Sequence, residues 1–432
     1  MIEKNDIPGN WSLTALETFL DYIQPTRYIV ESTDYHDSYK TPVLTAGKSF
    51  LLGYTNETDG IFTQLPTIIF DDFTTAIKFV NFPFKVKSSA MKILVPTSDI
   101  VNIRYVYYFM ETLRITADTH KRYWISIGAK HNIPVPPLAE QQRIVAKIEE
   151  LFSELDKGIE SLKTAQQQLK IYRQAVLKYA FEGKFTNPDV KEGELPEGWV
   201  TKIFKDVALI KRGKSKHRPR DAKELFGGPY PFIQTGEVRA ANGGTIKHFK
   251  QTYSELGLSQ SKLWPAGTLC LTIAANIGDV AFLGFDACFP DSVVGVIPDQ
   301  HMVNVDFLRY YIQRIKQELD SSATATAQKN LNLEILEKVN IILPSLDEQF
   351  FMIQEIESRL SVCDKIEESI EQGLQQAEAL RQSILKKAFE GKLVPQDPND
   401  EPASVLLERI KAERTAAEPV KKIKKAKTKY EK

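Results

Sequence analysis

Six positively charged side chains fall within ten residues of the sequence, from Lys211 to Arg220. Glycine and proline interrupt this run, so it predicts a loop rather than one face of a helix. Lysine and arginine in such a loop suit contact with phosphates, and arginine can also bind a guanine edge through two hydrogen bonds. An ordinary solvated surface is the alternative interpretation. The candidate contacts are Lys211, Arg212, Lys214, Lys216, Arg218 and Arg220.

Polar residues beside predicted strands form a second group of candidate contacts. Gln234 and Thr235 follow a predicted strand, and a glutamine side chain suits the hydrogen-bonding edge of adenine. An ordinary polar turn is an equally good interpretation of this pair. Asp71 and Asp72 could accept from cytosine N4, but a structural role is favoured because carboxylates repel phosphate. The remaining candidates are polar or aromatic residues of turn-rich stretches: Thr41, Thr45, Lys48, Tyr54, His120, Lys121, Arg122, Tyr123, Gln328, Lys329 and Asn330.

Motifs for ATP hydrolysis and methyl transfer are missing from the sequence. The tripeptide Gly-Lys-Ser occurs at 47–49 and 213–215, but a phosphate-binding loop needs a further glycine five residues before its second glycine, where Pro42 and Ala208 stand. The chain has no Asn-Pro-Pro-Phe or Asn-Pro-Pro-Tyr, which an amino-methyltransferase needs, and no Gly-x-Gly-x-x-Gly after a strand. We therefore expect no catalytic residues and no enzyme activity.

The histidines and cysteines predict neither a metal site nor a disulfide framework. The six histidines are scattered, and Cys270, Cys288 and Cys363 lie far apart without a Cys-x-x-Cys pair. Free cysteines of this kind are typical of a reducing compartment. The N-terminus has no apolar signal region, and no stretch approaches 18 apolar residues. We expect a cytoplasmic protein that has no contact with membranes.

Composition places the chain among globular proteins of several domains. It has 432 residues, of which 42% are hydrophobic and 26% charged. Its formal net charge is zero, whereas a protein that binds nucleic acid alone is usually basic. This balance still permits a binder with local basic patches or with partners that neutralise phosphates.

One long segment occurs twice and predicts the elements that position the candidate contacts. Residues Pro136–Lys184 reappear without a gap at Pro344–Lys392, with 22 of 49 positions identical. Apolar residues recur at alternating steps of four and three, with Tyr172 in the expected seam of the first copy and Ile366 and Leu380 in that of the second. This spacing predicts for each copy a helix of about 65 Å packed along another helix. Gly183 and Gly391 are suited to end these helices in the left-handed conformation. If the two helices pair with each other, chain order makes them antiparallel; pairing between separate chains is the alternative.

The segments beside the helices predict two β-rich heads and an α+β fold. Short β-branched and aromatic runs bounded by turn residues predict strands in both, and helical runs follow at 101–113 and 305–319. The sequence repeat is faint here, although Thr67–Phe84 can be aligned with Thr268–Phe285. Near two-fold symmetry within one chain is expected from this duplication. The predicted domains are 1–135, 136–185, 186–343, 344–393 and 394–432.

The last predicted domain is expected to return to the first head. Its final stretch, Lys421–Lys432, contains seven lysines. A disordered solubilising tail is the favoured interpretation of this stretch, and an arm that contacts phosphates is the alternative.

The repeated motifs resemble those of one protein family. Pro-Pro-Leu-Ala-Glu-Gln at 136–141 and Pro-Ser-Leu-Asp-Glu-Gln at 344–349 open the two helices, and Ala-Phe-Glu-Gly-Lys closes both. Leu-Pro-Glu-Gly-Trp at 195–199 and Ser-Lys-Leu-Trp-Pro-Ala-Gly-Thr-Leu at 261–269 complete the set. Over its whole length the chain resembles the specificity subunit of type I restriction–modification systems.

The resemblance implies DNA recognition without catalysis by this chain. Each head would be a target recognition domain that reads half of a split site in double-stranded DNA. The helices would act as a spacer and bind modification subunits, expected to be two, and restriction subunits through them. Other subunits would use S-adenosylmethionine, ATP and Mg²⁺, while this chain would bind no cofactor. Partner contacts are expected at the repeated motif residues Glu140, Gln141, Phe181, Glu348, Gln349 and Phe389.

A protein of a different class is also compatible with the sequence. A non-catalytic tethering protein could use the same helices to join two heads that bind other proteins, and the zero net charge favours it slightly. A neighbouring gene that carries a methyltransferase motif would decide for the DNA-reading subunit.

Overall fold

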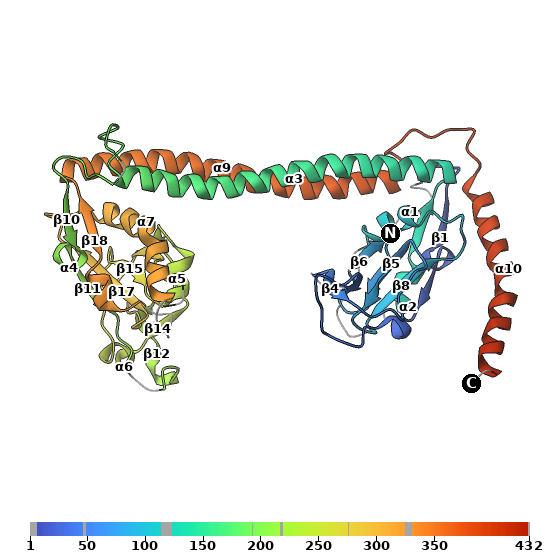
Figure 1. Cartoon of the computed structure of the whole chain (residues 1–432), viewed down its shortest axis with the longest axis horizontal. Helices are drawn as coiled ribbons and strands as arrows, with labels where there is room; N and C mark the ends of the chain where they lie inside the picture. The colour runs from blue at the N-terminus through green and yellow to red at the C-terminus, as the bar shows by residue number, and fades with distance from the viewer. Residues whose placement is uncertain are drawn as a thin grey trace. The chain divides into compact units, whose positions relative to one another are not determined.

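The computed structural model of the chain describes residues 7–45, 49–113, 123–191, 193–216, 219–274, 276–324 and 331–430, with the backbone alone at 322–324 and 417–430. The chain divides into two compact units (Figure 1). Unit 1 comprises Met1–Leu162 and Gln372–Lys432, and unit 2 comprises Lys163–Glu371. Both unit boundaries fall inside the long helices, so each unit contains one head and part of each helix.

The head of unit 1 is built on a four-stranded antiparallel sheet of order β2-β8-β5-β6. A three-stranded sheet of order β4-β3-β7 and the antiparallel pair β1-β9 complete it. Its strands are β1 (Ser12–Ala15), β2 (Leu20–Ile23), β3 (Thr41–Leu44), β4 (Leu51–Thr55), β5 (Thr67–Asp71), β6 (Ile77–Val80), β7 (Lys85–Val86), β8 (Met91–Pro96) and β9 (Asn132–Val135). Its helices are α1 (Ile103–Met110) and α2 (Tyr123–Ser126), with 3-10 turns at Leu16–Thr18, Pro25–Tyr28 and Gly128–Lys130.

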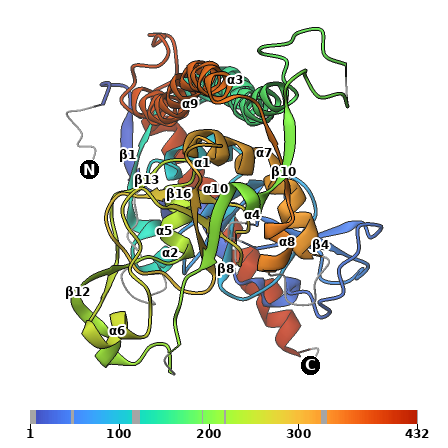
Figure 2. The same ribbon diagram turned by 90° about the vertical axis from the view of Figure 1, so that its left-hand side faces the viewer.

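The head of unit 2 is built on a five-stranded sheet of order β11-β17-β15-β16-β13, with pairs β10-β18 and β12-β14 beside it. Its strands are β10 (Val200–Ile203), β11 (Ala208–Arg212), β12 (Phe226–Phe232), β13 (Thr245–Ile246), β14 (Gln251–Tyr253), β15 (Leu269–Thr272), β16 (Val280–Leu283), β17 (Val293–Pro298) and β18 (Asn340–Leu343). Its helices are α4 (Phe204–Val207), α5 (Thr235–Ala240), α6 (Glu255–Ser259), α7 (Val305–Thr324) and α8 (Leu333–Glu337), with a 3-10 turn at Lys223–Leu225. Helix α7 lies between the sheet and the long helices (Figures 1 and 2).

The two heads share one topology although their sequences have diverged. The order β2-β8-β5-β6 corresponds strand for strand to β11-β17-β15-β16, and β1-β9 corresponds to β10-β18. The predicted match of Thr67–Phe84 with Thr268–Phe285 falls on the hairpins β5-β6 and β15-β16. Thr75 and Asn276, at matching positions of the two turns, both have positive φ, at 58° and 69°. The heads are therefore copies of one unit whose loops have changed.

The long helices are α3 (Leu138–Phe181) and α9 (Leu346–Phe389), in agreement with the periodicity of the sequence. In unit 1, Ile144 near the start of α3 shares a buried cluster with Ile384 near the end of α9. In unit 2, Leu177 near the end of α3 shares a cluster with Met352 near the start of α9. Within each unit, the helices therefore run antiparallel.

The contact seam between these helices differs from the predicted one at several positions. Tyr172 is 47% exposed, and Arg173 occupies the seam in its place, with a nitrogen 2.6 Å from Asp364. The physical reason is that an arginine can bury its aliphatic stem while its charged end reaches the partner helix. Arg381, the residue equivalent to Arg173 in the second copy, pairs with Asp156, the equivalent of Asp364. The exposed side chains of α9 include two that were expected in the seam, Ile366 and Leu380.

The C-terminal segment returns to the first head, as predicted. Helix α10 (Ala403–Tyr430) buries Leu406 and Ile410 in the core of unit 1. Arg414 donates to the carbonyl of Glu17 at 2.8 Å and to Asp21 at 3.0 Å. We expected the lysine-rich stretch to be disordered, but most of it lies in this helix. Lysine, which dominates the stretch, and alanine are good helix formers.

Candidate nucleic-acid interface

The basic run of unit 2 is partly strand and partly loop. Lys211 and Arg212 end strand β11, which corrects the prediction of a loop throughout, while Lys214 and Lys216 lie in the loop that follows. All four residues are exposed. The backbone N–H of Lys216 donates to Gln260 Oε1 at 2.6 Å, so the loop is held to the end of α6.

One cation of this patch was missed by the sequence analysis. Lys262 has a pKa below its usual value because it is partly desolvated and because Lys211 and Lys214 repel its charge. Its Nζ lies 3.7 Å from the centre of the Trp264 ring. A phosphate bound among these three lysines would relieve their mutual repulsion. Lys262 belongs to the motif at 261–269, but only the fold brings it to the loop of Lys211 and Lys214.

Two arginines of the patch already have protein partners. Arg212 donates to the carbonyl of Leu331 at 3.3 Å, and Arg220 forms an ion pair with Asp291 at 3.0 Å. The Arg220 pair is about half exposed on both sides and is therefore weak, so a nucleic acid could compete for this guanidinium. Arg218 lies outside the described residues.

A cleft of about 500 Å³ brings Arg220 and Gln234 together. Phe232 and Tyr253 line it, with their rings stacked at 4.1 Å. Gln234 donates from Nε2 to Gln251 Oε1 at 2.7 Å, at the end of the β12-β14 ladder. Thr235 is half-buried at the start of α5.

Three candidates of unit 1 lie on or beside one hairpin. Thr41 and Tyr54 lie on the paired strands β3 and β4, and Thr45 follows β3 directly. All three are half-buried, so part of each side chain is accessible. Besides Arg218, the candidates that lie outside the described residues are Lys48, His120, Lys121, Arg122, Gln328, Lys329 and Asn330.

Tyr123 is wrong as a candidate contact. It is 3% exposed and belongs to the hydrophobic core of unit 1.

The acidic pair Asp71 and Asp72 has a structural role. Asp72 is buried, accepts from the backbone N–H of Trp124 at 3.0 Å and forms an ion pair with Lys92 at 3.1 Å. The favoured structural role of Asp71 and Asp72 is confirmed for both, since Asp71 accepts from the N–H of Phe73 at 2.8 Å.

The repeated glutamates and glutamines are not exposed partner contacts, contrary to the prediction. Glu140 is fully buried and accepts from Trp11 Nε1 at 3.0 Å, while burial raises its pKa. Gln141 donates to the carbonyl of Pro136 at 3.0 Å. Gln349, also fully buried, is bonded to three backbone groups of its own unit. Glu348 is half-buried and bonded to Thr186.

The repeated phenylalanines are anchors of the heads and not surface contacts. Phe181 packs edge-on against Phe307 and Tyr311 of α7, with ring centres 5.1 and 5.2 Å away. In unit 1, Phe389 packs in the same way against Tyr105 and Phe109 of α1. The physical reason for the correction is that each repeated motif fastens a helix end to its own head.

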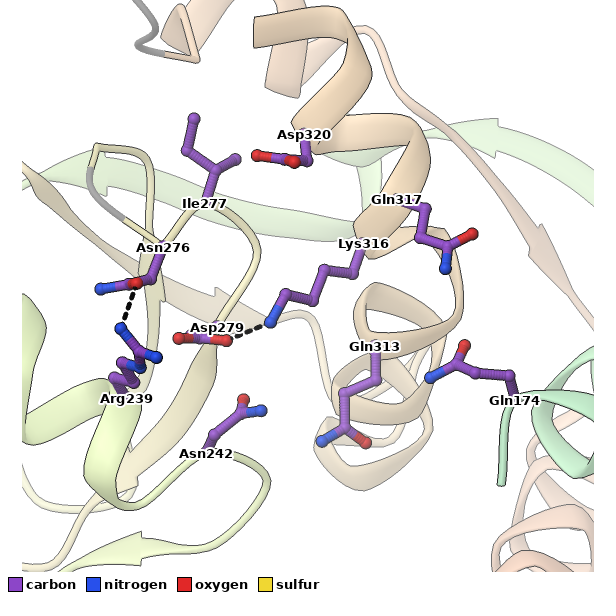
Figure 3. Close-up of a pocket in the computed structure, with 10 residues that line it drawn as sticks. All are labelled: Gln174, Arg239, Asn242, Asn276, Ile277, Asp279, Gln313, Lys316, Gln317 and Asp320. Carbon is purple, nitrogen blue, oxygen red and sulfur yellow. Dashed lines mark hydrogen bonds and ion pairs between the residues drawn. The ribbon is translucent and has the colours of Figure 1, made fainter. Parts of the chain in front are cut away.

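A second cleft of unit 2, of about 510 Å³, is lined mostly by polar side chains (Figure 3). Arg239 donates to Asn276 at 2.7 Å, and Lys316 is paired with the buried carboxylate of Asp279. None of the predicted contacts lines this cleft. Its charged groups are largely matched within the protein.

The described part of the chain contains no cluster of three His, Cys, Asp or Glu side chains that could hold a metal ion. Its three cysteines are free and buried. Among the described helices, none combines the length and apolar character needed to span a bilayer.

Comparisons with known proteins give a consistent result. The family model described as Type I restriction modification DNA specificity domain matches residues 8–169 and 196–379. The specificity subunit of the Escherichia coli type I restriction enzyme EcoR124I/EcoR124II is 32% identical over 384 residues, or 84% of this chain and 88% of that subunit. The Escherichia coli EcoBI specificity subunit is 29% identical over 66% of this chain and 65% of its own length. One solved chain, from work on the assembly and conformational transition of the type I R-M system, has a TM-score of 0.68 at 18% identity and covers 90% of this chain and 99% of that chain.

Proposed function

The chain belongs to the family of specificity subunits of type I restriction–modification systems, which are non-catalytic DNA-recognition subunits, and we propose that it reads a bipartite DNA site. Each head reads one half of this site. The paired helices form an antiparallel coiled coil with internal pseudo-two-fold symmetry. Their length sets the number of unrecognised base pairs, the DNA spacer, between the two half-sites.

The observation that carries this proposal is the contrast between the heads and the helices. The heads have one strand order but little sequence in common, whereas 22 of 49 helix positions are identical. A shared frame with altered loops is what two readers of different sequences require. The exposed lysines beside the cleft of unit 2 supply the phosphate contacts that hold such a reader on DNA.

Exposed apolar side chains on the helices support a docking surface for modification subunits, expected to be two. Val362 and Ile366 are 54% and 44% exposed and lie one turn apart on α9. Tyr172 and Tyr179 of α3, in the same unit, are 47% and 42% exposed. Single exposed apolar side chains are common, but apolar side chains that adjoin on a helix surface can form part of an interaction site. The modification subunits in turn bind restriction subunits, and these other subunits of the complex use S-adenosylmethionine, ATP and Mg²⁺.

The methylome of the host tests this proposal. With its modification partner expressed, cells that carry the gene should contain one bipartite adenine-methylated motif, and cells that lack it should not. A methylome that stays the same after deletion would contradict the proposal. The alternative hypothesis, a tethering protein whose heads bind other proteins, predicts an unchanged methylome.

Replacing Lys214 and Lys216 with alanine should weaken binding to all DNA sequences equally. Each lost phosphate contact should reduce the slope of log affinity against log salt by about one unit. The measurement is the affinity of the assembled complex for cognate and unrelated duplexes over a range of salt. Lys202→Ala, at an exposed lysine of β10, is the control. A loss confined to the cognate duplex would show that these lysines read bases.

Replacing Val362 and Ile366 together with glutamate should weaken the binding of modification subunits by about tenfold or more. Both side chains are exposed, so the fold should tolerate the change. Gln354→Glu adds negative charge at an exposed position of α9 without removing apolar surface. Equal affinities for the variant and this control, measured by titration calorimetry, would place the docking surface elsewhere.

A further inference from the structure

Two glutamines at the cleft of unit 2 are joined into one hydrogen-bonding group. Gln234 follows β12, and Gln251 begins β14 opposite Phe232 in the antiparallel ladder. Their side-chain amides are bonded at 2.7 Å, and both residues are exposed. Only Gln234 is marked by the sequence as a candidate, since the two residues come from separate segments.

The bond between the amides determines what they can offer to a ligand. Each amide has one carbonyl oxygen and one amino group. Because the amino group of Gln234 is used on the oxygen of Gln251, the pair presents the oxygen of Gln234 and the amino group of Gln251. The oxygen of Gln234 also accepts from the N3 backbone of α5 in a capping box, which sets the orientation of this amide and leaves its second lone pair for a ligand.

One acceptor beside one donor is complementary to a single base edge in the major groove. Adenine presents the N7 acceptor and the N6 donor there, whereas guanine presents two acceptors. Cytosine has one donor, and thymine has one acceptor beside a methyl group. We propose that Gln234 and Gln251 together bind the N7 and N6 groups of one adenine in the half-site read by unit 2. This inference rests on the proposed function.

The surroundings of the pair suit this task. Phe232 and Tyr253 stack on each other and line the same cleft as the pair, and Tyr253 is 1% exposed, so the β12-β14 ladder beside both glutamines is firmly anchored. The backbone N–H of Gln234 donates to Glu237 at 3.1 Å, which fixes the start of its segment. Arg220 lines the same cleft and can reach a phosphate beside the base.

The test uses the complete complex with its modification subunits and duplexes that carry 7-deaza-adenine at each adenine of the second half-site in turn. Loss of N7 at one position should weaken binding of the wild-type complex about tenfold. Gln251→Glu replaces the free amino group with an acceptor and should weaken binding to the natural duplex about ten- to a hundredfold. It should also remove the sensitivity to 7-deaza-adenine at that position, and Gln234→Glu should act in the same way.

Gln300→Glu makes the same chemical change at an exposed residue that does not line the cleft and should leave affinity unchanged. Thermal unfolding and binding of modification subunits show whether each variant is folded. If the wild-type complex methylates a bipartite motif but no adenine of the second half-site is sensitive to 7-deaza substitution, the inference is wrong while the proposed function stands. Folded variants of Gln234 and Gln251 that keep full affinity would overturn the inference in the same way. If the wild-type complex methylates no bipartite motif, the proposed function itself fails.

Discussion

Replacing Gly183 with alanine should lower the free energy of unfolding of unit 2 by about 2–5 kcal/mol. Gly183 ends α3 with φ at +76°, a conformation in which a side chain costs about 1–2 kcal/mol. A Cβ atom there would also lie 2.2 Å from Cγ of Pro196, and the proline ring cannot swing away. Overpacking of this kind adds about 1–3 kcal/mol.

Gly198→Ala separates the two contributions. Gly198 has φ at +84°, but nothing lies within 4 Å of the Cβ position. Its replacement should therefore cost only the about 1–2 kcal/mol of backbone strain. Urea unfolding of the full chain gives both values. Equal losses for the two variants would mean that the contact between the helix end and the Pro196 turn has no weight in stability.

Replacing Gln349 with alanine should lower the unfolding free energy by about 3 kcal/mol, because buried backbone groups would lose their partners. Gln349 donates to the carbonyls of Met302 at 3.0 Å and Pro344 at 3.1 Å, and accepts from the N–H of Asn304 at 2.8 Å. Gln141, at the same place in the first copy, donates to the carbonyl of Pro136 at 3.0 Å.

Gln141→Ala is the matched control, and its expected loss is about 1 kcal/mol. Urea unfolding compares the two variants, and the affinity of each folded variant for modification subunits tests the function. We expect that affinity to stay as in the wild type, since both glutamines hold a helix to its head. A large loss of affinity without loss of stability would restore the partner-binding role that the sequence had indicated.

Local patterns in the sequence predicted the elements well. The steps of three and four between apolar residues located α3 and α9, and Gly183 and Gly391 end them with φ at +76° and +70°. Helix periodicity and terminal glycines depend on residues that are close together along the chain, so they can be recognised in a single sequence. The seam prediction was wrong at Tyr172, because the neighbouring Arg173 lies in the seam instead. A long charged side chain can take a seam position when the opposite helix supplies a carboxylate, here that of Asp364.

Individual side-chain contacts between distant segments could not be predicted in this way. The repeat indicated a partner contact for Glu140, but its side chain is buried and one carboxylate oxygen accepts from Trp11 of the same unit. Lys262 and Gln251 reach the candidate interface only through the sheet and hairpin of unit 2. The repetition of a motif indicated a role shared by both copies, but only the fold showed that this role is to anchor each helix end to its own head.

The exchange of one head tests the central claim most directly. Residues 186–343 would be replaced by the corresponding segment of a related specificity subunit, with both long helices kept. Sequencing the methylome of cells that carry this chimera and the modification partner should reveal a motif whose first half and spacer are unchanged and whose second half is new. A change in both halves, or in neither, would contradict the account that each head reads its own half-site.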